Sequence, residues 1–182
     1  MTVVSNDADF DLYRTHGIKT NLVTMRKIDQ LLAEYGASHQ NVTNKTIHWI
    51  CVPLIFFSVL GLIASIPSGL VQTYLGLGNP YANWGTVALL LAITYYVSLS
   101  ITLTIGMALF GLLCLFVDKT IAQSGLSLWM VCLGIFVAAW IGQFYGHEVE
   151  GKKPSFFKDL QFLLIGPAWL LHFIYKRLGI PY

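Results

Sequence analysis

One stretch of this sequence, from Trp84 to Val117, runs for 34 residues without a charged side chain. As a single α-helix it would be about 51 Å long, because each residue adds about 1.5 Å. The hydrocarbon core of a bilayer is only about 30 Å thick. The run therefore predicts two shorter helices, with a break in the stretch from Tyr95 to Ser100.

The composition places the whole chain in a membrane. Hydrophobic residues make up 55% and charged residues 11% of the 182 residues, against about 45–50% and about 25% in soluble domains. This excludes a soluble globular enzyme and a disordered chain, and a net charge of +2 does not indicate a nucleic-acid partner. The three cysteines all lie in apolar runs and give no disulfide framework. We expect an all-α, polytopic membrane helix bundle that forms one domain over residues 1–182.

Four membrane spans are the favoured interpretation of the apolar runs. A polar tail at 1–20 and an amphipathic helix at 21–36, with apolar residues at three- and four-residue steps, precede them. A last apolar segment at 156–177 contains Gly166-Pro167, which predicts a broken or re-entrant helix. The four spans are expected at residues 47–66, 84–98, 100–117 and 126–146.

Lysine and arginine positions give the orientation. Basic residues precede the first span, and Lys152, Lys153 and Lys158 follow the fourth. The positive-inside rule puts both groups on the cytoplasmic side, so an even number of crossings separates them. The run from Trp84 to Val117 is then two spans or, as an alternative, a re-entrant hairpin. Both termini are then cytoplasmic, in the inner membrane of a bacterium or the endoplasmic reticulum of a eukaryote. A fifth crossing by the last segment is the alternative.

Four histidines lie at the cytoplasmic ends of hydrophobic segments in this topology: His39, His48, His147 and His172. They come from separate regions of the chain but share one membrane face. Imidazoles brought together in this way are suited to a metal site between helices. The alternative for each histidine is a polar side chain at the end of a helix, without a ligand.

Two polar stripes support an inward-facing site. The residues are Asn41, Asn44, His48 and Cys51 in the first stripe and Gln143, His147 and Glu150 in the second. Steps of three and four residues put each stripe on one face of its helix. Polar side chains on otherwise apolar helices are costly unless they face the protein interior. We therefore expect the two stripes to face each other.

Two motifs resemble a known family. The segment YGASHQNVTNKTIHWICVP (Tyr35 to Pro53) contains H-x-N-x-x-N-x-x-x-H, and the region from Trp140 to Phe173 begins with WIGQFYGHEVEGKKP. The second motif has the form W-x-x-Q-F-x-G-H…E…K-x-P. Together they are similar to the Mpo1-like family, formerly the domain of unknown function DUF962. With the apolar segments between them, the resemblance covers nearly the whole chain.

The resemblance implies an Fe(II)-dependent dioxygenase that shortens 2-hydroxy fatty acids by one carbon, a step of fatty acid α-oxidation. Its partners are then a long-chain 2-hydroxy fatty acid, O2 and membrane lipid. His39, His48 and His147 match the family's histidines and are expected to be catalytic iron ligands, and His172 is added to the metal site from its position. The residues expected to orient the imidazoles or contact the substrate are Asn41, Asn44, Gln143, Glu150, Lys152 and Lys153.

Other functions remain open from the residues alone. Histidines do not separate iron from zinc, so a zinc-dependent membrane hydrolase is one alternative. A non-catalytic lipid-binding or scaffold protein is another, with polar stripes that join helices. A transporter is disfavoured, because no acidic or basic side chain and no histidine lies between Trp84 and Val117. A homo-oligomer is compatible with the sequence.

Overall fold

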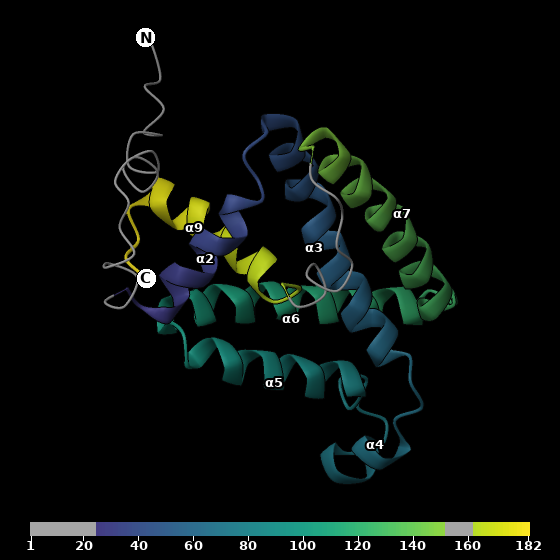
Figure 1. Ribbon diagram of the computed structural model, residues 1–182. Coiled ribbons are helices and arrows are strands. Elements are labelled where there is room, and N and C mark those ends of the chain that lie inside the picture. Colours follow the sequence, from purple (N-terminus) through teal and green to yellow (C-terminus); the bar gives the residue numbers. More distant parts are fainter. Residues whose placement is uncertain (1–24, 152–161) are drawn as a thin grey trace.

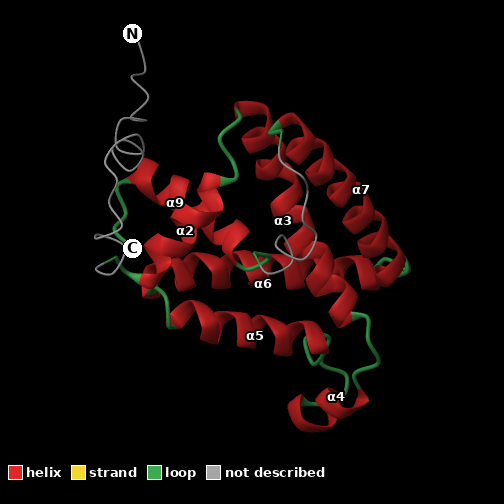
Figure 2. Ribbon diagram, in the orientation of Figure 1, coloured by secondary structure: helices red, strands yellow, loops and turns green. Residues whose placement is uncertain are grey.

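The computed structural model describes residues 25–151 and 162–182. Every regular element in these two parts is a helix, so the prediction of an all-α membrane bundle is confirmed (Figures 1 and 2). The helices are α2 (Lys27–Ala37), α3 (Val42–Ala64), α4 (Gly69–Leu75), α5 (Trp84–Val97), α6 (Ile101–Gln123), α7 (Leu128–Val149) and α9 (Ile165–Leu178).

Among the described residues, α3, α6 and α7 are long and apolar enough to cross a membrane, and α5 is a shorter apolar helix. Many of their large apolar side chains are exposed on the outside of the bundle. A soluble protein would not leave so many such side chains facing water. These outward faces support an integral membrane protein. Four crossings with cytoplasmic termini remain a proposal.

The long charge-free run is divided as its length requires. Helix α5 ends at Val97 and α6 begins at Ile101, so the turn between them lies within the stretch from Tyr95 to Ser100. The hydroxyl of Ser100 accepts a hydrogen bond of 3.4 Å from the backbone N–H of Leu103. This side chain caps α6, where the first N–H groups have no partner within the helix.

Helix α6 continues further than the expected span at residues 100–117. It ends at Gln123 and carries Asp118, whose side chain is buried. The thiol of Cys132 on α7 lies 3.9 Å from a carboxylate oxygen of Asp118, and Gly61 on α3 faces the same place. The span was expected to end before this first charge. The helix continues because Asp118 packs inside the bundle.

Helices α3 and α7 form the central pair and run in opposite directions (Figure 1). Gly146 at the end of α7 faces Asn44 at the start of α3, and Gly142 one turn away faces Cys51. A Cβ atom at Gly146 would lie 2.5 Å from Oδ1 of Asn44. Small residues at four-residue spacing allow two helices to approach closely in a membrane. This contact brings the two polar stripes together.

Helices α2 and α9 cover the side of the bundle where α3 begins (Figure 1). The apolar face of α2 is formed by Ile28, Leu32 and Tyr35, and it packs on Trp169 and neighbouring residues of α9. Helix α2 corresponds to the predicted amphipathic helix, and within the described residues it begins at Lys27. Residues 1–20, and the start of the helix predicted at 21–36, lie outside the described residues.

The discontinuity expected at Gly166-Pro167 coincides with the start of α9, because both residues lie in its first turn. Proline is tolerated there, since the N–H groups of a first turn have no partner within the helix. Residues 156–161 of the expected C-terminal segment lie outside the described part of the chain.

Candidate metal centre

Three histidines meet where α3 begins and α7 ends. His39 lies in the loop between α2 and α3, His48 in the second turn of α3 and His147 in the last turn of α7. Their exposed fractions are 2%, 0% and 5%, respectively. Each ring offers one nitrogen, and these three nitrogens all lie within 4.8 Å of one another. Three neutral imidazoles at this separation can ligate a single metal ion.

Backbone carbonyl groups orient two of the rings. Nδ1 of His39 lies 2.6 Å from the carbonyl oxygen of Tyr35, and Nδ1 of His48 lies 2.9 Å from that of Asn44. Since a carbonyl oxygen only accepts hydrogen bonds, Nδ1 donates in both rings. In the neutral form of each ring, Nε2 then carries a lone pair and no proton.

The two Nε2 atoms of His39 and His48 are 2.9 Å apart. Two lone pairs at this distance repel each other unless a cation lies between or beside them. Two nitrogens bound about 2.1 Å from one ion lie about 3 Å apart, which matches the separation seen here. The donor set therefore fits a metal ion, and imidazole ligands suit zinc, copper, iron or nickel.

Two aromatic side chains that the sequence analysis did not identify form a wall of the site. The ring of Tyr35 stacks on His39 with centroids 4.3 Å apart, and Trp169 lies 5.5 Å from the same ring. Both aromatic residues are buried. The spacing of Tyr35, one helical turn before His39, was the signal that could have identified it. Trp169 gave no such signal, because tryptophans near membrane surfaces are common.

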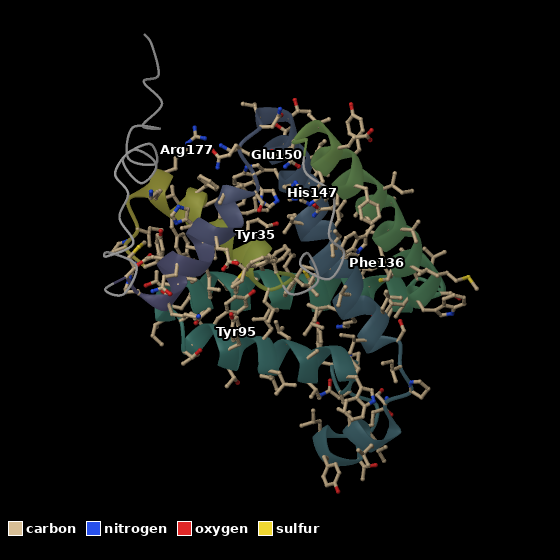
Figure 3. All side chains as sticks on the ribbon, viewed as in Figure 1. Tyr35, Tyr95, Phe136, His147, Glu150 and Arg177 are labelled. Atoms are coloured by element: carbon tan, nitrogen blue, oxygen red, sulfur yellow. The ribbon has the colours of Figure 1, made fainter. Side chains whose placement is uncertain are left out.

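Glu150 connects the two polar stripes. Its carboxylate accepts hydrogen bonds from the backbone N–H groups of Gln40 and Asn41, at 2.8 and 2.9 Å, and from Nδ2 of Asn44 at 2.9 Å. Gln40 directly follows His39, and Asn44 lies one turn before His48. The end of α7, which carries His147, is thereby fixed to the segment with the other two histidines. Figure 3 labels Glu150, His147 and Tyr35 on this part of the molecule.

The remaining predicted site residues have different positions. Asn41 is the N-cap of α3, and its side chain accepts hydrogen bonds from Thr43 and Asn44. Gln143 is buried one turn before His147 and lines a small pocket. Lys152 and Lys153 lie outside the described residues.

His172 lies outside the group formed by the other three histidines. It sits in α9, and its Nδ1 is hydrogen-bonded to the hydroxyl of Tyr182. Burial, together with the positive charge of Lys176, lowers the pKa of His172 to about 4. The structure thus places this residue in a separate contact between α9 and the C-terminal residues.

One protein family matches this chain over most of its length. Residues 25–178 match the family described as 2-hydroxy-palmitic acid dioxygenase Mpo1-like. The chain belongs to the Mpo1-like family. The matched region includes all three clustered histidines, as well as Glu150 and the aromatic wall. No curated protein and no solved structure gives a significant match to the chain.

Proposed function

We propose that this protein is an Fe(II)-dependent dioxygenase that cleaves 2-hydroxy fatty acids to products one carbon shorter, a step of fatty acid α-oxidation. The observation that carries the proposal is the buried group of His39, His48 and His147, with its three nitrogens within 4.8 Å. The family description, a 2-hydroxy-palmitic acid dioxygenase, supports the substrate class and the use of O2.

The chemistry of a 2-hydroxy acid suits such a site. Its carboxylate and 2-hydroxyl oxygens can chelate one ion, and bound Fe2+ would supply the open positions at which substrate and O2 react. The carbonyl groups of Tyr35 and Asn44 keep the Nδ1 protons of two histidines in place. Tyr35 and Trp169 cover the His39 ring with apolar surface, which limits access of water.

The position at the ends of α3 and α7 suits a membrane substrate. An acyl chain reaches the protein most easily from the bilayer, while its polar head stays near the headgroups. A site where two membrane helices begin and end allows the head to reach the histidines and the tail to stay in an apolar environment. We place this end on the cytoplasmic side, in agreement with the distribution of lysines.

The experiment is metal analysis of anaerobically purified protein, followed by oxygen uptake with a long-chain 2-hydroxy acid. The proposal predicts about one iron per chain, oxygen uptake, and formation of the one-carbon-shorter product. His147→Ala should abolish both metal binding and turnover. His172→Ala is the comparison, because it removes an imidazole that lies outside the three-histidine group.

Two other results would contradict this proposal and indicate a different function. Stoichiometric zinc without oxygen uptake would indicate a zinc-dependent hydrolase. Absence of any bound transition metal, with His48→Ala affecting stability alone, would indicate a lipid-binding or scaffold protein whose histidines join helices.

A further inference from the structure

A pocket lies beside the histidines, between α3, α7 and the end of α2. Its walls are Val52 and Ile55 from α3, Trp140 and Gln143 from α7, and Tyr35 from α2. Phe162 and Leu163, which precede α9, complete the lining. The cavity measures about 20 Å³, which is room for one or two groups of about the size of a water molecule or a methylene, and not for a whole acyl chain.

The pocket has a fixed relationship to the metal centre. Val52 lies four residues after His48, Gln143 four residues before His147, and Tyr35 four residues before His39. One helical turn is about 5.4 Å long. Because α3 and α7 are antiparallel, a step forward on α3 and a step back on α7 lead in the same direction, into the apolar part of the bundle. The pocket is therefore about one turn from the histidines on the membrane side.

Gln143 is the unusual side chain in this lining. Its exposed fraction is 6%, its amide atoms are not fully enclosed, and no described residue forms a hydrogen bond with them. An amide in this position, bordering a small cavity inside the bundle, can form its hydrogen bonds with a ligand or water in that cavity. Apart from Gln143, the tyrosine hydroxyl and the indole N–H of Trp140, the lining is hydrocarbon. This combination suits a ligand with a polar head followed directly by hydrocarbon.

We propose that this pocket binds the first carbons of the fatty acid, beside its carboxyl head, and that the amide of Gln143 donates a hydrogen bond to an oxygen of that head. This inference rests on the proposed function, since it assigns a place to the same substrate. The head then reaches the histidine nitrogens, and the remaining chain extends toward the bilayer. Gln143 and Ile55 become residues that position the substrate rather than ligands of the metal.

Two variants test the pocket. Ile55→Phe adds bulk inside it, and Leu54→Phe is the matched control, because Leu54 is the neighbouring residue on α3 and faces outward. Gln143→Leu removes the amide at similar volume. The measurement is the Kd of 2-hydroxyhexadecanoic acid for the metal-loaded protein without O2, together with metal content and Tm.

We expect each variant to raise the Kd at least about tenfold, with metal content unchanged. Gln143→Leu loses one hydrogen bond to a charged head, which has this size. Ile55→Phe fills the space that the first carbons of the acid would occupy. Leu54→Phe should bind like the wild type. If Ile55→Phe does not fold, Leu163→Phe fills the pocket from its other wall.

If the wild-type protein binds the acid and the Kd is unchanged in Ile55→Phe and Gln143→Leu, this inference is overturned and the proposed function stays intact. A higher KM for O2 with an unchanged Kd for the acid would also overturn it, because the pocket would then hold oxygen. Loss of metal in Gln143→Leu would overturn the inference for this residue, because Gln143 would then orient the histidines and not the substrate. If the wild-type protein binds no 2-hydroxy acid, the proposed function itself fails.

Discussion

The carboxylate of Glu150 at the end of α7 accepts a 2.9 Å hydrogen bond from the side-chain amide of Asn44 in the first turn of α3. The two residues are 106 positions apart in the chain. Together with the backbone N–H groups of Gln40 and Asn41, this contact fixes the segment from His39 to His48 against the helix that carries His147. The three-histidine group depends on this connection between distant segments.

Replacing Glu150 should weaken metal binding. In Glu150→Gln, one carboxylate oxygen becomes an NH2 group that faces N–H donors, so at least one of the three hydrogen bonds is lost. We expect the metal affinity to fall about 10- to 100-fold, as for other residues that orient ligands. Titration with Fe2+ under anaerobic conditions measures this. The control is Glu148→Gln, two residues away and exposed, which should bind like the wild type.

The close approach of α3 and α7 predicts opposite effects for two glycines of α7. A Cβ atom at Gly146 would lie 2.5 Å from Oδ1 of Asn44, whereas one at Gly134 would meet no atom within 4 Å. Gly146→Ala should destabilise the protein by about 1–3 kcal/mol. Gly134→Ala should be neutral or stabilise it by up to about 1 kcal/mol, because alanine favours a helix. Equal effects in thermal unfolding would contradict this packing.

His172 predicts loss of stability in acid. Burial and the nearby Lys176 lower its pKa to about 4, from an ordinary value of 6.5. Between these pH values the unfolded chain binds a proton that the folded protein does not, so the free energy of unfolding decreases as the pH falls. His172→Gln should reduce this decrease, seen as a smaller change in Tm between pH 7 and pH 4. An identical pH dependence in both proteins would exclude His172 as a cause.

Removal of the metal should lower thermal stability. A ligand present at about 100 times its Kd stabilises the folded state by about 2.7 kcal/mol, which is about 5–10 °C in Tm for a chain of this size. A chelator should therefore lower the Tm of the wild-type protein by this amount. His147→Ala should show no further change on chelation, since it has already lost the ion. A chelator-sensitive Tm in that variant would place the ion elsewhere.

The sequence predicted the features of the structure that depend on neighbouring residues in the chain. The length of the run from Trp84 to Val117 required a break, and the structure turns between Val97 and Ile101. Steps of three and four residues correctly put His48 and Asn44 on one face, since helix geometry alone determines this. Buried positions of His48 and His147 followed from the cost of polar groups in an apolar helix.

Tertiary packing determined the features that the sequence did not predict. His39 lies in a loop, and its position depends on the stacking of Tyr35 and on Trp169 from α9, which no periodicity indicates. His172 was added to the site because it lies near the end of an apolar segment, but it sits in the middle of α9, where its side chain contacts Tyr182. Asp118 marked the expected end of a span, yet it is buried inside the bundle.

The most direct test of the metal centre is X-ray absorption at the iron edge of anaerobically purified protein. We predict one iron per chain with about three imidazole nitrogens at about 2.1 Å, and loss of this imidazole scattering in His39→Ala, His48→Ala and His147→Ala. A first shell of sulfur, or one with fewer than two imidazoles, would contradict the three-histidine centre. So would full metal occupancy in the three alanine variants.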